Sequence, residues 1–309
     1  MGNVLSPKPG FAFQLRPACI CGARLDGAVA PRVIRHCWGD IQFQCCPQCG
    51  SWCQSPQVTP VSLADWYDSD FYQGSGGHSG DAYDNYEADE PQRHAESRQR
   101  FARDISPWLN HRPANILEIG CASGSLLAVA REAGHQVTGV DLSARFAEQA
   151  RRLNRLEIVV GDFLHIPLPE YTYDAVLLFG TASNLVDFPQ SLRRIRQLMR
   201  PNGRMFLNFP HSDSWLARLY GRQFWMFAPS VATFASTAGM ARCATHNGWT
   251  VEALSLDHQR PSFRKLIKHT KLAHVLPEAL TKLVSSRLLP VSLPIPAVKL
   301  ARLRPVGDM

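Results

Sequence analysis

The sequence predicts an α/β protein with a doubly wound, mostly parallel seven-stranded sheet and a small N-terminal zinc ribbon. Two observations lead to this fold class. From residue 113 onward, short apolar runs alternate with amphipathic segments, as strands and helices alternate along a parallel sheet. In addition, seven of the nine cysteines lie between residues 19 and 53, a clustering typical of a metal site.

The elements follow in order along the chain. We predict a zinc-ribbon-like domain (1–56), a connector and cofactor lid (57–112), a cofactor-binding domain (113–260) and a basic C-terminal extension (261–309). Strands are expected at 114–120, 135–141, 156–162, 173–180, 204–210 and 249–256, and helices at 125–134, 143–154, 188–200 and 236–248. The extension is expected to add helices at about 262–274 and 277–287 and a strand near 296–303 at the sheet edge.

The first strand of this region runs into a turn of small residues, ILEIGCASGS (116–125). Gly120 and Gly124 let the backbone approach a ligand closely, which larger side chains would block. The spacing differs from the G-x-G-x-x-G of dinucleotide sites, because Ala122 and Ser125 stand where two glycines are required. No Gly-Lys-Ser/Thr follows either, so a P-loop is excluded.

Acidic residues stand at or near three successive strand ends, Glu118, Asp141 and Asp162. The carboxyl ends of parallel strands form the ligand-binding edge of such a sheet, where an acid can accept hydrogen bonds from ribose hydroxyls. Three carboxylates repel a pyrophosphate. They suit a ligand that carries an amine, a ribose and an adenine.

Five stretches in this order resemble the class I S-adenosylmethionine-dependent methyltransferases: LEIGCASGSLL, GVDLS, GDF, YDAVLLFG and LMRPNGRMFLNFP. The resemblance covers roughly residues 80–256 and implies a Rossmann-like methyltransferase fold with S-adenosylmethionine as cofactor. It implies that Glu118 and the glycine turn flank the methionine part, that Asp141 holds the ribose, and that Asp162 with Phe163 lies at the adenine.

The preceding stretch, DWYDSDFYQGSGGHSGDAYDNY, is similar to the lead-in of one subgroup with an N-terminal zinc ribbon. That subgroup methylates sugars, glycans or natural products, and a Tyr-x-x-Tyr segment covers its cofactor. Tyr83 and Tyr86 match this segment, although both also suit packing aromatics of a connector. The expected cofactor-binding residues are Tyr83, Tyr86, Glu118, Gly120, Cys121, Ala122, Gly124, Asp141, Leu142, Asp162, Phe163 and Phe179.

The cysteine cluster contains one regular zinc knuckle, Cys46-Pro-Gln-Cys49-Gly, whose spacing lets both thiolates face one ion. The other arm, ACICG, is irregular, because Ala18 stands where a cysteine is expected. We predict that a structural zinc is bound by Cys19, Cys21, Cys46 and Cys49, with His36, Cys37 or Cys53 as substitutes. The alternative is a degenerate ribbon that has lost its metal.

Methyl transfer to a hydroxyl requires a positioned nucleophile and a base that removes its proton. In the resembling subgroup an acid–histidine pair follows the fourth strand, where this chain has Ser183 and Asn184. We therefore predict His211 as the general base, because its usual pKa suits proton transfer near neutrality, with Asp213 orienting it. A helix-capping or surface histidine is the structural alternative.

Charge is unevenly distributed in this chain of net charge +7, since its last 50 residues hold ten Lys and Arg against two acidic residues. Such a segment attracts phosphates on nucleic acid, on a lipid surface or on a phosphorylated carrier, unless it is a solvated helix face.

The expected function is methylation of a sugar, glycan precursor or related small molecule, through O-methylation. A phosphorylated carrier or a membrane surface is the expected peripheral partner of the basic tail. The sequence shows no secretion leader and no apolar run near the about 18 residues of a spanning helix, so we expect a cytoplasmic protein, peripheral at the inner membrane face. Two alternatives stay open. One is an RNA methyltransferase, with nucleic acid the less favoured partner, and the other is a non-catalytic protein that keeps the fold.

Overall fold

The computed structural model describes residues 10–25, 31–70, 72, 86–109, 113–221, 224, 226–259 and 293–306. The predicted helices at 262–274 and 277–287, and most of the basic extension, lie outside the described residues. No helix among the described residues is long and apolar enough to cross a membrane.

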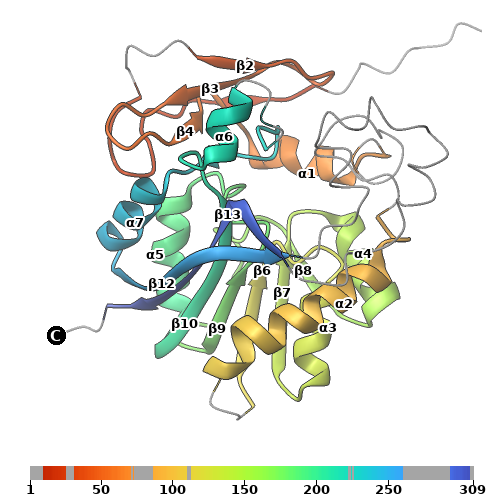
Figure 1. Ribbon diagram of the computed structural model, residues 1–309. Coiled ribbons are helices and arrows are strands. Elements are labelled where there is room, and N and C mark those ends of the chain that lie inside the picture. Colours follow the sequence, from red (N-terminus) through yellow and green to blue (C-terminus); the bar gives the residue numbers. More distant parts are fainter. Residues whose placement is uncertain are drawn as a thin grey trace, which may run out of the picture.

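A seven-stranded sheet with the order β12-β13-β10-β9-β6-β7-β8 forms the centre of the molecule (Figure 1). Its strands are β6 (Asn115–Ile119), β7 (Gln136–Asp141), β8 (Ile158–Val160), β9 (Tyr173–Leu178), β10 (Met199–Pro210), β12 (Trp249–Gln259) and β13 (Leu293–Pro305). The strands from β10 to β8 are parallel to one another, so the predicted mostly parallel α/β sheet is confirmed.

The last strand is placed differently from the prediction. We expected it at the sheet edge, but β13 lies between β10 and β12 and runs antiparallel to both. Leu303 pairs with Met205 on one side and with Val251 on the other. Small and branched apolar side chains such as Ala301 are buried here, as an interior strand requires.

Helices cover both faces of the sheet, and alternate residues of β6 face the two layers. Ile116 packs in a core cluster with α3, α4 and the π-helical turn that follows α2, whereas Leu117 packs in another with α5 and α7. The helices are α2 (Glu90–Arg100), α3 (Ser125–Glu132), α4 (Ala144–Asn154), α5 (Phe188–Leu198) and α7 (Thr237–His246). A π-helical turn (Phe101–Ile105) and a 3-10 turn (Ser106–Trp108) follow α2 and lead toward β6.

The cysteine-rich segment lies over one end of the sheet, at the top of Figure 1. Its strands are β1 (Phe13–Gln14), β2 (Arg32–Ile34), β3 (Ile41–Cys45), β4 (Trp52–Gln54) and β5 (Gln57–Val58). The helix α1 (Pro60–Asp68) follows, in a stretch where we predicted only a connector. The short helix α6 (Trp215–Tyr220) lies beside this segment in the same view.

This segment is joined to the large domain through a shared sheet. The strand β11 (Thr233–Phe234), which comes from the large domain, pairs with β4 in the order β11-β4-β3-β2. The buried Arg16 strengthens the connection by donating to the Ala232 carbonyl oxygen at 2.6 Å and to Thr233 Oγ1 at 2.8 Å. Backbone and side-chain hydrogen bonds therefore join the cysteine-rich segment directly to the domain that carries the seven-stranded sheet.

Candidate functional site

The turn between β6 and α3 has the backbone geometry that its small residues predict. Gly120 and Gly124 adopt φ values of 70° and 74°, and Ala122 adopts 47°. A Cβ atom on Gly120 would lie 2.4 Å from Thr181 Oγ1, so glycine is required here by packing as well as by conformation. The Ala122 N–H donates to Asp141 Oδ2 at 2.8 Å, which holds the strained residue in place.

Two carboxylates are buried at the ends of β6 and β7. Burial, aided by the neighbouring Asp141 charge, raises the pKa of Glu118 to about 8, and Glu118 Oε2 has no hydrogen-bond partner among the described residues. Burial also raises the pKa of Asp141 to about 6, against the opposing hydrogen bonds from the backbone N–H groups of Ser143 and Ala122. Since an unpaired buried carboxylate is costly, Glu118 fits a cationic ligand group.

Two arginines of α2 that sequence reasoning missed line the same cavity as Glu118. Arg100 forms a two-pronged ion pair with the fully buried Asp257 at 2.9 and 3.1 Å and lies over the Phe179 ring. Arg93 keeps two buried nitrogens, Nε and Nη1, without hydrogen-bond partners among the described residues. Arg93 and Arg100 are seven residues apart, which puts both on one face of α2. This spacing is the feature of the sequence that could have identified them as a pair facing the cavity.

The cavity gathers most of the predicted cofactor residues. Its wall includes Tyr86, Glu118, Gly120, Cys121, Ala122, Asp141, Leu142, Asp162, Phe163 and Phe179. Gly124 does not belong to this wall among the described residues; it caps α3 in a left-handed conformation. Tyr83 lies outside the described residues.

Within this wall, Tyr86 is buried, its hydroxyl lies 3.4 Å from Ser123 Oγ, and its ring packs on Phe146. Asp162 is partly open, since one oxygen accepts the Leu164 N–H at 3.0 Å and the other lies 3.1 Å from His165 Nδ1. Aromatic and acidic groups thus line the part of the cavity where the adenine and ribose were expected.

At the end nearer the cysteine-rich segment, polar and aromatic groups line the cavity, and the buried Arg16 belongs to the wall as well. Tyr67 and Tyr72 from the N-terminal side and Asn184 from the loop after β9 belong to its wall. Asn184 Nδ2 donates to the Tyr67 hydroxyl oxygen and to the Gly180 carbonyl oxygen, at 3.3 Å each. These contacts fix the amide that stands in place of the expected acid–histidine pair.

The geometry of His211 argues against its predicted role as general base. Nδ1 lies 2.9 Å from Asp213 Oδ1 and Nε2 lies 3.0 Å from the Pro296 carbonyl oxygen, so both ring nitrogens face acceptors. The side chain is buried and does not belong to the described wall of the cavity. Asp213 also accepts from the N–H and the hydroxyl of Thr237. The pair therefore ties the end of β10 to β13 and α7.

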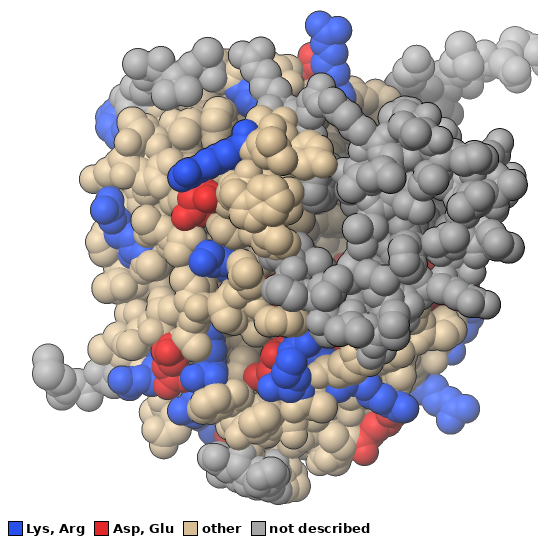
Figure 2. All heavy atoms as spheres, viewed as in Figure 1, with Lys and Arg blue, Asp and Glu red and all other residues tan. Residues whose placement is uncertain are grey.

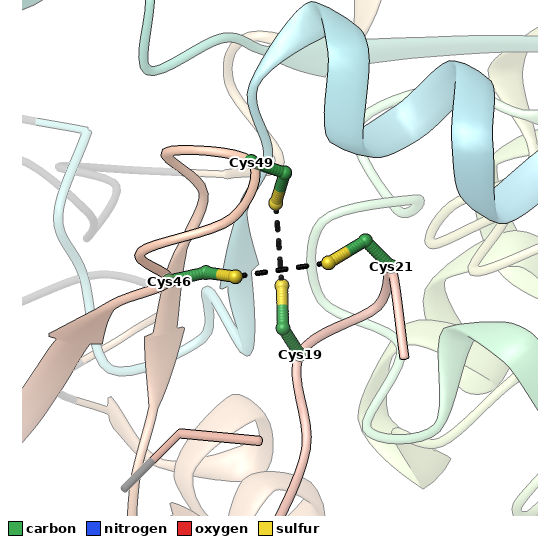
Figure 3. Close-up of side chains that lie close together, drawn as sticks. All are labelled: Cys19, Cys21, Cys46 and Cys49. Carbon is green, nitrogen blue, oxygen red and sulfur yellow. Dashed lines mark hydrogen bonds between the residues drawn. The ribbon is translucent and has the colours of Figure 1, made fainter. Parts of the chain in front are cut away.

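The four cysteines predicted as metal ligands converge on one point (Figure 3). The sulfur atoms of Cys19, Cys21, Cys46 and Cys49 all lie within 4.8 Å of one another. The Cys19–Cys49 and Cys21–Cys46 distances are 3.6 and 3.7 Å. Sulfurs around a tetrahedral zinc, with Zn–S bonds of about 2.3 Å, are about 3.8 Å apart, so the donor set fits this ion.

The surroundings of this cluster also fit a metal–thiolate site. Four thiolates and a divalent ion carry two negative charges. The Arg16 guanidinium is buried nearby and donates to uncharged acceptors, the Ala18 and Ala232 carbonyl oxygens and Thr233 Oγ1, so its positive charge can balance such a site. The pKa of Cys53 is lowered to about 7, mainly by the hydrogen bond between Cys53 and Cys19 and to a smaller extent by the positive charge of Arg16. Of the predicted substitutes, Cys53 Sγ lies 3.7 Å from Cys19 Sγ, whereas Cys37 is exposed and outside the cluster.

Charges on the face shown in Figure 2 are mixed. Lys and Arg side chains of the described residues lie interspersed with Asp and Glu there and form no continuous basic patch. The described part of this face therefore adds no support for binding of nucleic acid.

Comparison with known proteins identifies the family. The family model described as "Methyltransferase domain" matches residues 86–254. An uncharacterized 37.1 kDa transposon protein of Streptomyces fradiae is 32% identical over 114 residues, 34% of this chain and 33% of that protein. A demethylmenaquinone methyltransferase of Symbiobacterium thermophilum is 27% identical over 188 residues, 57% of this chain and 74% of that protein.

Among solved structures, the 1,6-didemethyltoxoflavin-N1-methyltransferase of Burkholderia thailandensis, with bound 1,6-didemethyltoxoflavin and S-adenosylhomocysteine, is similar with a TM-score of 0.48. It is 18% identical, and the match covers 91% of this chain and 100% of that one.

Proposed function

The chain belongs to the methyltransferase-domain family, and from this premise we propose that it transfers a methyl group from S-adenosylmethionine to a small-molecule acceptor. The observation that supports this most strongly is that an acidic and a basic side chain on the wall of one cavity each keep buried polar atoms without hydrogen-bond partners. Glu118 Oε2 and the Nε and Nη1 atoms of Arg93 are buried without partners among the described residues. They match the ammonium and carboxylate groups of an amino-acid moiety.

The remaining cofactor contacts are proposed on the same wall. Asp141 uses each carboxylate oxygen for one backbone N–H, at 2.8 and 2.9 Å, and each oxygen retains capacity for a ribose hydroxyl. Leu142, Asp162 and Phe163 would hold the adenine. S-adenosylmethionine supplies an electrophilic methyl group when bound, and the protein's task is to orient it and to exclude water.

For the acceptor we propose a sugar or glycan-precursor hydroxyl. The Tyr67 and Tyr72 rings pack against each other and against Trp66, and this aromatic wall suits contact with a ring. Asn184 offers an amide that is held in place to orient a hydroxyl. A quinone-like ring is the second candidate, because the Symbiobacterium thermophilum relative is named for demethylmenaquinone. The expected peripheral contact with a membrane or a phosphorylated carrier rests on the basic extension, most of which lies outside the described residues.

The test is calorimetric titration of S-adenosylmethionine and S-adenosylhomocysteine into the wild type, Asp141→Ala and the exposed control Asp65→Ala. We expect micromolar binding to the wild type and the control, and a loss of at least tenfold in Asp141→Ala. Absence of binding to metal-replete wild type would contradict the proposal. If binding is found, turnover with nucleotide sugars against quinones separates the two acceptor classes.

A further inference from the structure

Glu90, the first residue of α2, is a buried carboxylate surrounded by hydrogen-bond donors. Its side chain accepts from Ser123 Oγ and Ser125 Oγ at 2.7 Å each and from Asn154 Nδ2 at 2.6 Å. It also forms an ion pair with Arg93 Nη2 at 2.5 Å. A buried carboxylate with this many donors is satisfied as an anion, and a neutral side chain could not accept from all of them.

The partners of Glu90 come from three separate elements around the cofactor turn. Ser123 lies in the turn itself, Ser125 opens α3, and Asn154 ends α4. Asn154 Nδ2 also donates to the Ser123 carbonyl oxygen at 2.8 Å, so the turn is held from its backbone and from its side chain. One carboxylate therefore connects α2 to the segment that carries the strained Ala122.

The same carboxylate fixes the arginine to which we assign the cofactor carboxylate. Glu90 holds Arg93 by Nη2, while the guanidinium lies 3.6 Å above the centre of the Tyr86 ring. Tyr86 in turn reaches Ser123 with its hydroxyl. The ion pair and the ring together leave Nε and Nη1 as the unpaired donors of Arg93.

We propose that Glu90 is a positioning residue for the cofactor: it aims Arg93 at the amino-acid moiety and locks the glycine turn against α2. This inference rests on the proposed function, since it presumes that S-adenosylmethionine occupies the cavity. The proposal predicts an effect on cofactor binding and none on acceptor binding. Loss of the carboxylate should weaken binding of S-adenosylmethionine and S-adenosylhomocysteine, which share the amino-acid moiety, and leave the acceptor's KM unchanged.

Glu90→Gln tests this with a change of nearly constant volume, and Glu132→Gln is its matched control. Glu132 also joins α2 to α3, through Arg98 at 3.0 Å, but it does so on an exposed part of the pair. We expect the dissociation constant of S-adenosylmethionine to rise about tenfold in Glu90→Gln, as for a lost hydrogen bond to a charged group, and to stay within twofold in Glu132→Gln. Calorimetry measures both, and steady-state kinetics measures the acceptor's KM.

A second set of variants keeps the inference testable if Glu90→Gln folds poorly. Ser125→Ala removes a single donor and should raise the same dissociation constant about threefold. Where Glu90→Gln does fold, the double variant with Ser125→Ala should lose less affinity than the two single losses combined, because both changes remove one contact.

Unchanged cofactor affinity in Glu90→Gln, with wild type that does bind, would overturn the positioning role while the proposed function stands. A fall in melting temperature and kcat with no change in cofactor affinity would also overturn it, since a merely structural residue behaves in that way. If the wild type binds neither S-adenosylmethionine nor S-adenosylhomocysteine, the proposed function itself is contradicted, and the role of Glu90 that depends on it is contradicted as well.

Discussion

The cysteine cluster and the cavity at the glycine turn are both arranged for a small ligand, but they depend on that ligand to different degrees. The four sulfurs of the cluster lie within 4.8 Å of one another, and three of the four cysteines are buried. In the cavity, Glu118 and Arg93 keep unpaired atoms, yet they are carried by a complete sheet and its helices. We therefore expect a metal at the cluster to contribute to the stability of the fold, and a ligand of the cavity to contribute less, because its site is built on a sheet and helices that pack independently of it.

The largest effect should follow removal of the metal or of one thiolate. Cys46→Ser leaves three ligands, and structural zinc contributes on the order of 10 kcal/mol of folding free energy in small zinc domains. Because β4 shares a sheet with β11, we expect the melting temperature of the whole chain to fall by about 10 °C or more.

Calorimetric melting together with metal analysis of the purified protein measures this effect. Cys37→Ser is the matched control, because Cys37 is exposed and outside the cluster. A wild type without bound metal whose melting temperature is unaffected by Cys46→Ser would establish the degenerate ribbon in place of the zinc site.

The free energy of unfolding of the ligand-free protein should depend on pH because of Glu118 in the cavity. Burial raises the pKa of Glu118 from 4.5 to about 8, so the folded state binds a proton that the unfolded chain releases at lower pH. The corresponding stability is fully present below pH 4.5 and is lost as the pH rises through 8. At about 1.4 kcal/mol per unit of pKa difference, the loss amounts to a few kcal/mol.

Denaturant unfolding between pH 5 and about 8.5 compares the wild type with Glu118→Gln, which has no proton to lose. We expect the wild type to lose a few kcal/mol more than the variant across this window. Parallel stability curves would show that Glu118 is not the buried acid that the geometry describes, and would weaken its assignment to the cofactor ammonium.

A smaller loss of stability is expected at the glycine turn. It tests whether glycine is needed at position 120 for packing against Thr181 or for close approach of a ligand. Gly120→Ala places a Cβ atom 2.4 Å from Thr181 Oγ1 at a φ of 70°, whereas Gly134→Ala meets open space at a φ of 88°. The control should lose about 1 kcal/mol from backbone strain alone, and Gly120→Ala about 2–3 kcal/mol.

Adding Thr181→Ala to Gly120→Ala should restore stability to the level of the Gly134→Ala control, as measured by denaturant unfolding. If stability returns and cofactor binding does not, ligand approach is a separate reason for glycine at position 120. Equal stabilities of the two single variants would exclude crowding by Thr181.

The two sites were open to prediction from sequence to different extents. The four cysteines that cluster could be named because two short turns bring them together, even with Cys19 out of register. The glycine turn and its acids could be expected together because strand ends in a parallel sheet lie side by side, and Glu118 and Asp141 do line one cavity. Both inferences depend on contacts that are local in sequence or dictated by topology.

The misses share one physical cause, which is contact between segments distant in the chain. Arg100 meets its buried partner Asp257 across 157 positions, and β13 finds its place by pairing with two strands far from it in sequence. Neither periodicity nor spacing contains this information, because the stretch around Arg93 and Arg100 looks like an ordinary polar helix face. Polar residues spaced seven apart ahead of a cofactor turn are the signal worth testing in such sequences.

The smallest expected effect concerns His211, the residue that sequence reasoning assigned to catalysis. Because Nδ1 faces Asp213 and Nε2 faces the Pro296 carbonyl oxygen, at 2.9 and 3.0 Å, neither nitrogen is directed to the cavity. His211→Asn should therefore lower kcat/KM less than threefold and cost about 1 kcal/mol of stability through the lost contacts. A general base contributes about 10²–10⁴-fold, so a loss of that size with an altered pH–rate profile would reinstate the catalytic role. A small loss would confirm that the pair joins β10 to β13, and would leave Tyr67 and Asn184 as the polar groups to examine at the acceptor end.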